Sequence, residues 1–188
     1  MSAAARARIS ASQKARWART RGKVVSIAPN AAIAYAIAGQ DSKAQALAQG
    51  MASDHPEHIG IQLFSSFVQA FIALNHAKPG RALELLRPAS VYDATWVLLL
   101  SVRATSYLKS GKAQEAVQDF QHIRNLHSYH PDDPLISLAY VGQARGYQLL
   151  GDNTKARTAY QDFFALWKDA DPDIPILKQA KGEYAKLQ

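Results

Sequence analysis

The stretch Tyr147-Gln-Leu-Leu-Gly151-Asp-Asn-Thr-Lys-Ala156 has two counterparts earlier in this 188-residue chain, Tyr35-Ala-Ile-Ala-Gly39-Gln-Asp-Ser-Lys-Ala44 and Tyr107-Leu-Lys-Ser-Gly111-Lys-Ala-Gln-Glu-Ala116. In each stretch a glycine follows the tyrosine by four residues, and an alanine follows the glycine by five. Glycine readily adopts the left-handed conformation that ends a helix, and a small alanine lets two helices approach closely. Each stretch is therefore predicted to join two antiparallel helices through a tight turn.

A fourth, weaker copy lies between the first and second of these stretches. Ala82 occupies its alanine position, whereas Ala73 and Ala77 stand where the other copies have tyrosine and glycine. The four alanines are separated by 38, 34 and 40 residues. The extra residues fall at 87–94 and 128–134, where prolines indicate surface loops that tolerate insertions.

The repeated pattern resembles the tetratricopeptide repeat, in which Gly-x2-Tyr is followed by Ala-x3-Phe and Pro with a 34-residue period. Phe120 and Tyr160 follow their alanines by four residues, as that pattern requires. The resemblance implies an all-α fold, an α-solenoid of antiparallel helix pairs. Its units would lie near residues 30–57, 60–90, 95–130 and 134–170, within a domain spanning 25–188. An ordinary helical bundle without repeats is the alternative.

The C-terminal residues 174–187 are predicted to form a capping helix. Asp173 is expected to cap it and Pro175 to occupy its first turn. Apolar residues then recur every three to four positions and give one apolar face, while the lysines between them face water. A polar outer side is what the end of a solenoid requires.

Residues 159–175 and 82–88 resemble the C-terminal repeat region of a group of bacterial serine/threonine protein kinases. The kinase motifs themselves are missing: no glycine-rich phosphate loop, His-Arg-Asp loop or Asp-Phe-Gly triplet occurs. The resemblance therefore implies a sensor or scaffold half without its enzyme. The chain also has no cysteine, which excludes disulfides, thiolate zinc sites and a cysteine nucleophile. We expect no catalysis and no cofactor.

Residues 1–24 form a basic N-terminal segment, expected to be partly helical or disordered. Residues 1–23 contain seven Lys or Arg and no acid, so they carry the whole net charge of +7 and the remainder sums to zero. Such a segment could lie along nucleic-acid phosphates, with an indole stacked on a base; a solvated tail is the plainer reading. The residues that would contact nucleic acid are Arg6, Arg8, Lys14, Arg16, Trp17 and Arg19.

Histidines suggest two possible metal sites, which we do not expect to form. His55 and His58 flank a proline in a turn, and His122, His127 and His130 straddle a helix end and a loop. The acids Asp132 and Asp133 precede Pro134, a placement typical of a helix start.

A peptide-binding groove follows from the repeat register, because the first helix of each unit would line the concave face. The expected groove residues are Phe64, Phe67, Phe71, Leu98, Thr105, Lys109, Val141, Arg145 and Gln148. The groove would be largely apolar and suited to a peptide with bulky side chains. The three phenylalanines are equally compatible with packing between repeats.

The sequence contains no apolar run of the roughly 20 residues that span a bilayer and no signal-peptide pattern, so we expect a cytoplasmic location. The predicted function is non-catalytic binding of a protein or peptide by a scaffold or adaptor. The alternatives are a nucleic-acid-associated adaptor that uses the basic segment, and a regulatory remnant of a kinase acting with a separate catalytic chain.

Overall fold

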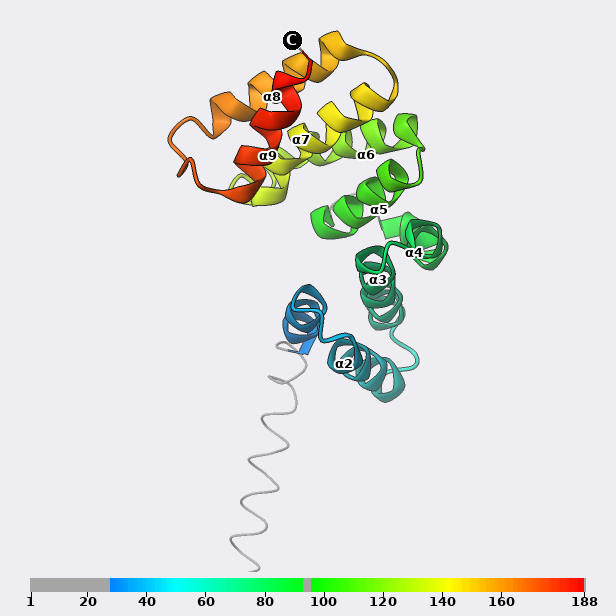
Figure 1. Ribbon diagram of the computed structural model, residues 1–188. Coiled ribbons are helices and arrows are strands. Elements are labelled where there is room, and N and C mark those ends of the chain that lie inside the picture. Colours follow the sequence, from blue (N-terminus) through cyan, green and yellow to red (C-terminus); the bar gives the residue numbers. More distant parts are fainter. Residues whose placement is uncertain (1–27, 93–95, 188) are drawn as a thin grey trace, which may run out of the picture. The chain divides into compact units, whose positions relative to one another are not determined.

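The computed structural model describes residues 28–92 and 96–187, and the basic segment 1–24 lies outside this range. Within the described residues every regular element is helical and no strand occurs, which confirms the predicted all-α, solenoid-like fold (Figure 1). The described residues divide into two compact units, one up to Ile72 and one from Ala73 onward.

The first unit contains a helix over residues 28–37, followed by α2 (Asp41–Asp54) and most of α3 (Ile59–Asn75). The second unit starts with the end of α3. Its elements are α4 (Pro79–Leu86), η1 (Arg87–Tyr92), α5 (Val97–Lys109), α6 (Ala113–Asn125), η2 (Leu126–Ser128), α7 (Pro134–Leu149), α8 (Asn153–Leu166) and α9 (Pro175–Ala185).

The turn within each repeat has a left-handed residue at the predicted position. Gly39, Gly111 and Gly151 have φ angles of +69°, +72° and +76°. In the weaker copy Ala77 takes the same role with a φ of +55°. The amide after each left-handed residue donates to the carbonyl five positions before it, which is the helix-ending arrangement known as a Schellman motif. These bonds are Gln40–Tyr35, Lys78–Ala73, Lys112–Tyr107 and Asp152–Tyr147.

The four repeat alanines are completely buried, as their small size predicts. Ala44, Ala82, Ala116 and Ala156 all have 0% exposure, and each lies in the helix that follows its turn. A larger side chain at these positions would push the neighbouring helix away. Together with the turns, these alanines show that the weaker copy follows the same register as the other three.

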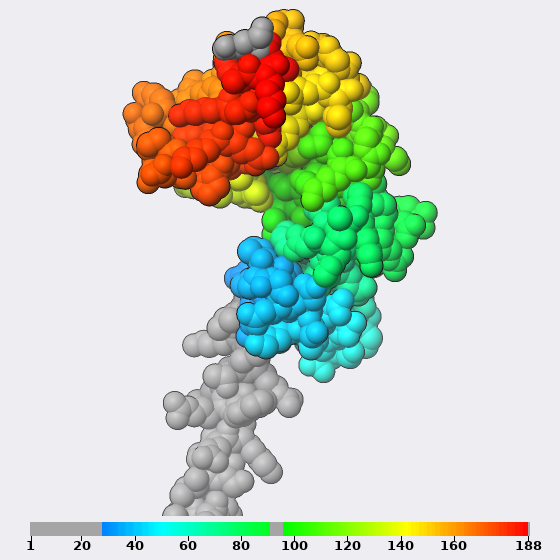
Figure 2. Space-filling model, in the orientation of Figure 1, coloured from blue at the N-terminus to red at the C-terminus, as the bar shows by residue number. Residues whose placement is uncertain are grey.

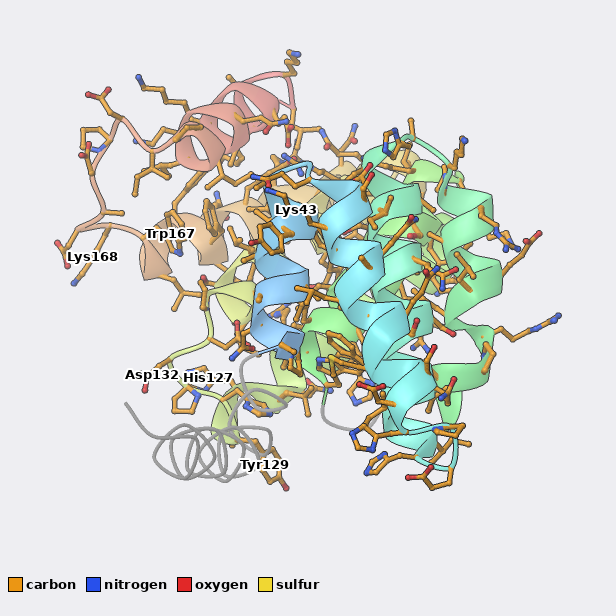
Figure 3. The ribbon with its side chains drawn as sticks, turned by 90° about the horizontal axis from the view of Figure 1, so that it is seen from below. Lys43, His127, Tyr129, Asp132, Trp167 and Lys168 are labelled. Atoms are coloured by element: carbon orange, nitrogen blue, oxygen red, sulfur yellow. The ribbon has the colours of Figure 1, made fainter. Side chains whose placement is uncertain are left out.

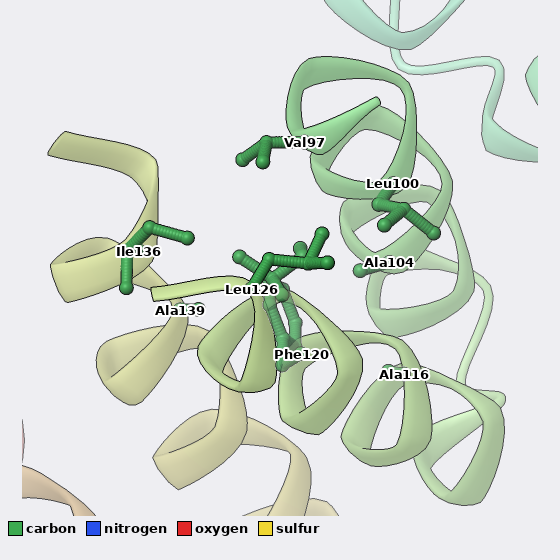
Figure 4. Close-up of a cluster of buried hydrophobic side chains, with 9 residues drawn as sticks. Val97, Leu100, Ala104, Ala116, Phe120, Leu126, Ile136 and Ala139 are labelled. Atoms are coloured by element: carbon green, nitrogen blue, oxygen red, sulfur yellow. The ribbon is translucent and has the colours of Figure 1, made fainter. Parts of the chain in front are cut away.

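The core of the second unit is built from overlapping sets of three consecutive helices. One buried cluster joins α5, α6 and α7 around Leu100, Phe120 and Ile136 (Figure 4). The next cluster joins α7, α8 and α9 around Val141, Phe163 and Leu177, among other residues. Each helix therefore shares its apolar surface with the helices before and after it, which is the packing principle of a solenoid.

Helix α9 packs over α7 and α8 in the second unit (Figure 2). Its N-cap is Ile174, and Pro175 is its first residue, so the expected capping role of Asp173 is wrong. The Asp173 carboxylate instead lies 2.8 Å from the Lys178 ammonium. The Asp173 backbone amide donates to the Asp171 carboxylate, and in this turn Asp173 lies one residue before the N-cap of α9.

Candidate functional site

The groove residues expected on α7 pack against α8 and α9. Val141 is buried in the cluster shared with Leu177. The Arg145 guanidinium makes a two-pronged ion pair with Glu183 of α9, at 2.9 and 3.0 Å. The Gln148 side-chain oxygen lies 3.1 Å from the Tyr160 hydroxyl oxygen on α8. Because their polar groups have partners inside the chain, these α7 residues are part of the internal packing.

Tyr160 and Glu183 form the centre of this packing. The Tyr160 hydroxyl donates to the Glu183 carboxylate at 2.7 Å. Burial and this neighbouring carboxylate raise the pKa of Tyr160 well above its ordinary value. Burial also acts to raise the pKa of Glu183, but hydrogen bonds from Arg145 and Tyr160 outweigh it and hold that pKa below its ordinary value.

The remaining groove residues differ in exposure. On α3, Phe64 and Phe67 are buried and Phe71 is half-buried, with adjacent ring centroids 6.2 and 6.3 Å apart. Such spacing is typical of aromatic core packing. On α5, Leu98 and Thr105 are half-buried and Lys109 is exposed. Among the expected groove residues, Lys109 is therefore the one that is fully open to solvent, whereas Leu98 and Thr105 are as accessible as Phe71.

A pocket of about 470 Å³ lies where the loop before α7 meets the end of α8. We call it the Trp167 pocket. Its lining residues are His127, Pro131, Asp132, Asp133, Pro134, Ile136, Ser137, Tyr140, Leu166 and Trp167. Figure 3 shows Trp167 and Lys168 on one side of this region and His127, Tyr129 and Asp132 on the facing loop. The volume is within the range of pockets that bind small ligands or single side chains.

Two aromatic rings form fixed walls of the pocket. The Trp167 ring packs on the fully buried Phe163 with centroids 4.9 Å apart. The Tyr140 ring lies 3.7 Å from the guanidinium carbon of Arg124. Arg124 in turn donates to Gln143 and lies 3.8 Å from the Asp162 carboxylate. Phe163 and Arg124, which do not line the pocket, therefore hold the two rings in position.

The polar groups at the pocket are mainly acidic. Asp133 caps α7 by accepting a hydrogen bond from the Leu135 amide at 2.9 Å, which confirms the helix-start interpretation. Within the described part of the chain, the exposed Asp132 carboxylate makes no hydrogen bond or ion pair. No lysine or arginine is among the lining residues. Two carboxylates therefore line the pocket, and the nearby Arg124 contacts the Tyr140 ring without lining it.

A second hollow, of about 380 Å³, lies in the first unit between α2 and α3. Its lining residues are Gln49, Ala52, Ser53, Pro56, Gln62 and Ser65. The Gln62 amide is already used there, because it donates to the carbonyls of Ala52 and His55. This hollow offers neither an aromatic wall nor a charged group.

The described residues do not bring together three or more side chains that could bind a metal ion. His127 and Asp132 reach the same pocket, but His122 and His130 do not line it. The same part of the chain contains no helix that is both long and apolar enough to cross a membrane. The nucleic-acid residues expected in the basic segment, from Arg6 to Arg19, lie outside the described residues.

No protein-family model, curated protein or solved structure matches this chain. The resemblances to tetratricopeptide repeats and to the kinase repeat region therefore remain predictions from the sequence. The sequence pattern alone does not predict the Trp167 pocket, because residues 131–134 have turn composition and Trp167 stands in the stretch that resembles the kinase repeat region. The signal was present in the insertion at 128–134, which lengthens the loop that faces Trp167.

Proposed function

We propose that this chain is a non-catalytic scaffold or adaptor that binds a segment of another protein at the Trp167 pocket. The observation that supports this function is the pocket itself, with two preformed aromatic walls and an unpaired carboxylate. Partly exposed aromatic side chains beside unused polar groups are typical of protein recognition sites. The cytoplasmic location expected from the sequence is compatible with this role.

Exposed apolar side chains extend the candidate surface beyond the pocket. Leu166, which lines the pocket, is 58% exposed, and Tyr129 on the preceding loop is 76% exposed. A bound segment would cover apolar area here at a gain of about 25 cal/mol per Å². Because the walls are already held by Phe163 and Arg124, little ordering is needed on binding, which favours affinity.

The proposal can be tested by recovering partners with the intact chain and two matched variants. Leu166 and Leu149 are equally exposed at 58%, but only Leu166 lines the pocket. We expect Leu166→Ser to abolish recovery of the partner and Leu149→Ser to retain it. The recovered partner should then bind the purified chain with the same difference between variants. Partners that are retained equally by both variants would contradict the proposed site.

A nucleic-acid-associated adaptor is the second candidate, and one specific observation favours it. The net charge of +7 is confined to residues 1–23, while the remaining residues are balanced. A concentrated basic segment is suited to binding phosphates through counterion release. The two candidates use different parts of the chain, so they can be tested separately.

A further inference from the structure

We infer that the Trp167 pocket accepts an arginine side chain from a basic segment of the partner protein. This inference rests on the proposed binding function and names the chemistry of its partner. It draws on three properties of the pocket: its aromatic walls, its two carboxylates and the lack of a partner for Asp132 within the described residues.

The aromatic walls suit a flat cation. Trp167 and Tyr140 are both half-buried, so parts of both side chains remain accessible from the pocket. A guanidinium group is planar and is attracted to the face of an aromatic ring, most strongly to tryptophan. The described part of the chain already contains such a contact, because the Arg124 guanidinium lies 3.7 Å from the centre of the Tyr140 ring.

The charge of the pocket selects a cation. Asp132 and Asp133 line it, and no lysine or arginine lines it. The nearby charge of Arg124 is partly balanced by Asp162 at 3.8 Å. A cation entering the pocket would therefore meet two carboxylates, whereas an anion would be repelled.

The Asp132 carboxylate is available to bind an arginine. Asp132 has no partner within the described residues, so a guanidinium can bind it without breaking an existing bond. Arginine and carboxylate groups form strong paired hydrogen bonds. A purely apolar occupant would instead remove the two carboxylates from water without compensation, which is unfavourable.

The test follows the indole N–H resonance of Trp167 in the ¹⁵N-labelled full chain, assigned with Trp167→Phe. The probes are acetylated hexa-arginine, hexa-lysine and hexa-citrulline peptides; citrulline keeps the shape of arginine without its charge. The chain carries a net charge of +7, so a cationic peptide has no general attraction to it. We expect hexa-arginine to shift the resonance saturably, hexa-lysine to bind at least threefold more weakly and hexa-citrulline at least tenfold more weakly.

Two charge-removing variants complete the test. Asp132→Asn should weaken hexa-arginine binding about tenfold, because the exposed side chain contributes only its charge. Asp169→Asn, an exposed acid that does not line the pocket, should change it less than twofold. Equal effects of the two variants, or equal affinity for arginine and lysine, would overturn the inference.

The outcomes separate this inference from the function on which it rests. If hexa-citrulline binds as tightly as hexa-arginine, the pocket binds peptides but does not select arginine. If no peptide moves the Trp167 resonance, the arginine inference fails, and partner recovery with the Leu166 and Leu149 variants still decides the binding function.

Discussion

Ala77 has a φ of +55° in a turn where the other three repeats place a glycine. An alanine in this conformation is strained, because its Cβ crowds the neighbouring carbonyl oxygen. The surrounding contacts nevertheless hold it there: the Lys78 amide donates to Ala73, and the Ala77 amide donates to Leu74. At the scale of single residues, therefore, the repeat geometry overrides the local preference of one amino acid.

Exchanging alanine and glycine at the left-handed position of two different turns tests that interpretation. Ala77→Gly should raise the free energy of unfolding by about 0.5–1 kcal/mol, because relief of strain exceeds the added chain entropy. Gly151→Ala should lower it by about 1 kcal/mol. A Cβ at Gly151 would meet nothing within 4 Å, so that loss comes from the backbone alone. Urea unfolding followed by circular dichroism measures both; destabilisation by Ala77→Gly would contradict the account.

The pair formed by Arg145 and Glu183 predicts a dependence of stability on pH. The pKa of Glu183 is lower in the folded chain than its ordinary value of 4.5. Its contribution is therefore fully present above pH 4.5 and is lost as the pH falls through the folded pKa. The half-buried Asp152 carboxylate, whose pKa hydrogen bonds from Lys155 also lower, adds to the same trend.

Replacing Glu183 should flatten this acid dependence. We expect Glu183→Gln to lower the free energy of unfolding at pH 7 by about 1–2 kcal/mol, because hydrogen bonds to a charged group are lost. The difference from the unmodified chain should shrink as the pH falls below 4.5. Urea unfolding between pH 3 and 7 measures it, with Asp169→Asn as an exposed control. A difference that stays constant with pH would exclude this role for Glu183.

At the scale of elements, glycines set the distance between α6 and α7. A Cβ at Gly142 would lie 2.3 Å from the Phe120 ring, and one at Gly146 would lie 2.6 Å from Val117. These distances are shorter than any normal contact. The helices pack this closely because α7 presents bare backbone to α6, and α7 in turn carries the Tyr140 wall of the pocket.

Adding one methyl group at Gly142 should therefore be costly. We expect Gly142→Ala to lower the free energy of unfolding by about 2–3 kcal/mol, the typical cost of overpacking a core. Gly182 in α9 provides the matched control, because a Cβ there meets nothing within 4 Å. Gly182→Ala should raise stability by up to about 1 kcal/mol through helix propensity. Thermal and urea unfolding compare the two, and similar effects would contradict the close-approach argument.

At the scale of the whole molecule, charge and packing are assigned to different parts of the sequence. The described units hold the helix pairs, the core clusters and the Trp167 pocket. The excess positive charge belongs to residues 1–23. Binding that depends on net charge should therefore be lost when this segment is removed, whereas binding at the Trp167 pocket should be retained.

Deleting residues 1–23 tests this division. If the nucleic-acid candidate is correct, the deletion should strongly weaken binding of a labelled DNA duplex and reduce the salt dependence of any affinity that remains. Fluorescence anisotropy over a range of salt concentrations measures both quantities. Trp167→Phe in the full chain is the control and should leave DNA binding unchanged. Unchanged affinity and salt slope after the deletion would eliminate this candidate.

Features that depend only on neighbouring residues follow from local sequence. A left-handed turn, a buried alanine nine residues after its tyrosine and the capping aspartate at Asp133 are set by backbone conformation and hydrogen bonds over a few positions. Local spacing therefore predicted the helices and their turns, including the weaker copy. It also led to one error at Asp173, where a turn stabilised by Asp171 moved the helix start by one residue.

Which surfaces remain open to solvent depends on contacts between residues far apart in the sequence. Register placed Val141, Arg145 and Gln148 in a groove, but the contacts that occupy them come from Leu177, Glu183 and Tyr160 elsewhere in the sequence. The Trp167 pocket likewise joins the 127–140 segment to the end of α8. Such contacts depend on how helices pack across long stretches of chain, and local periodicity does not encode that packing.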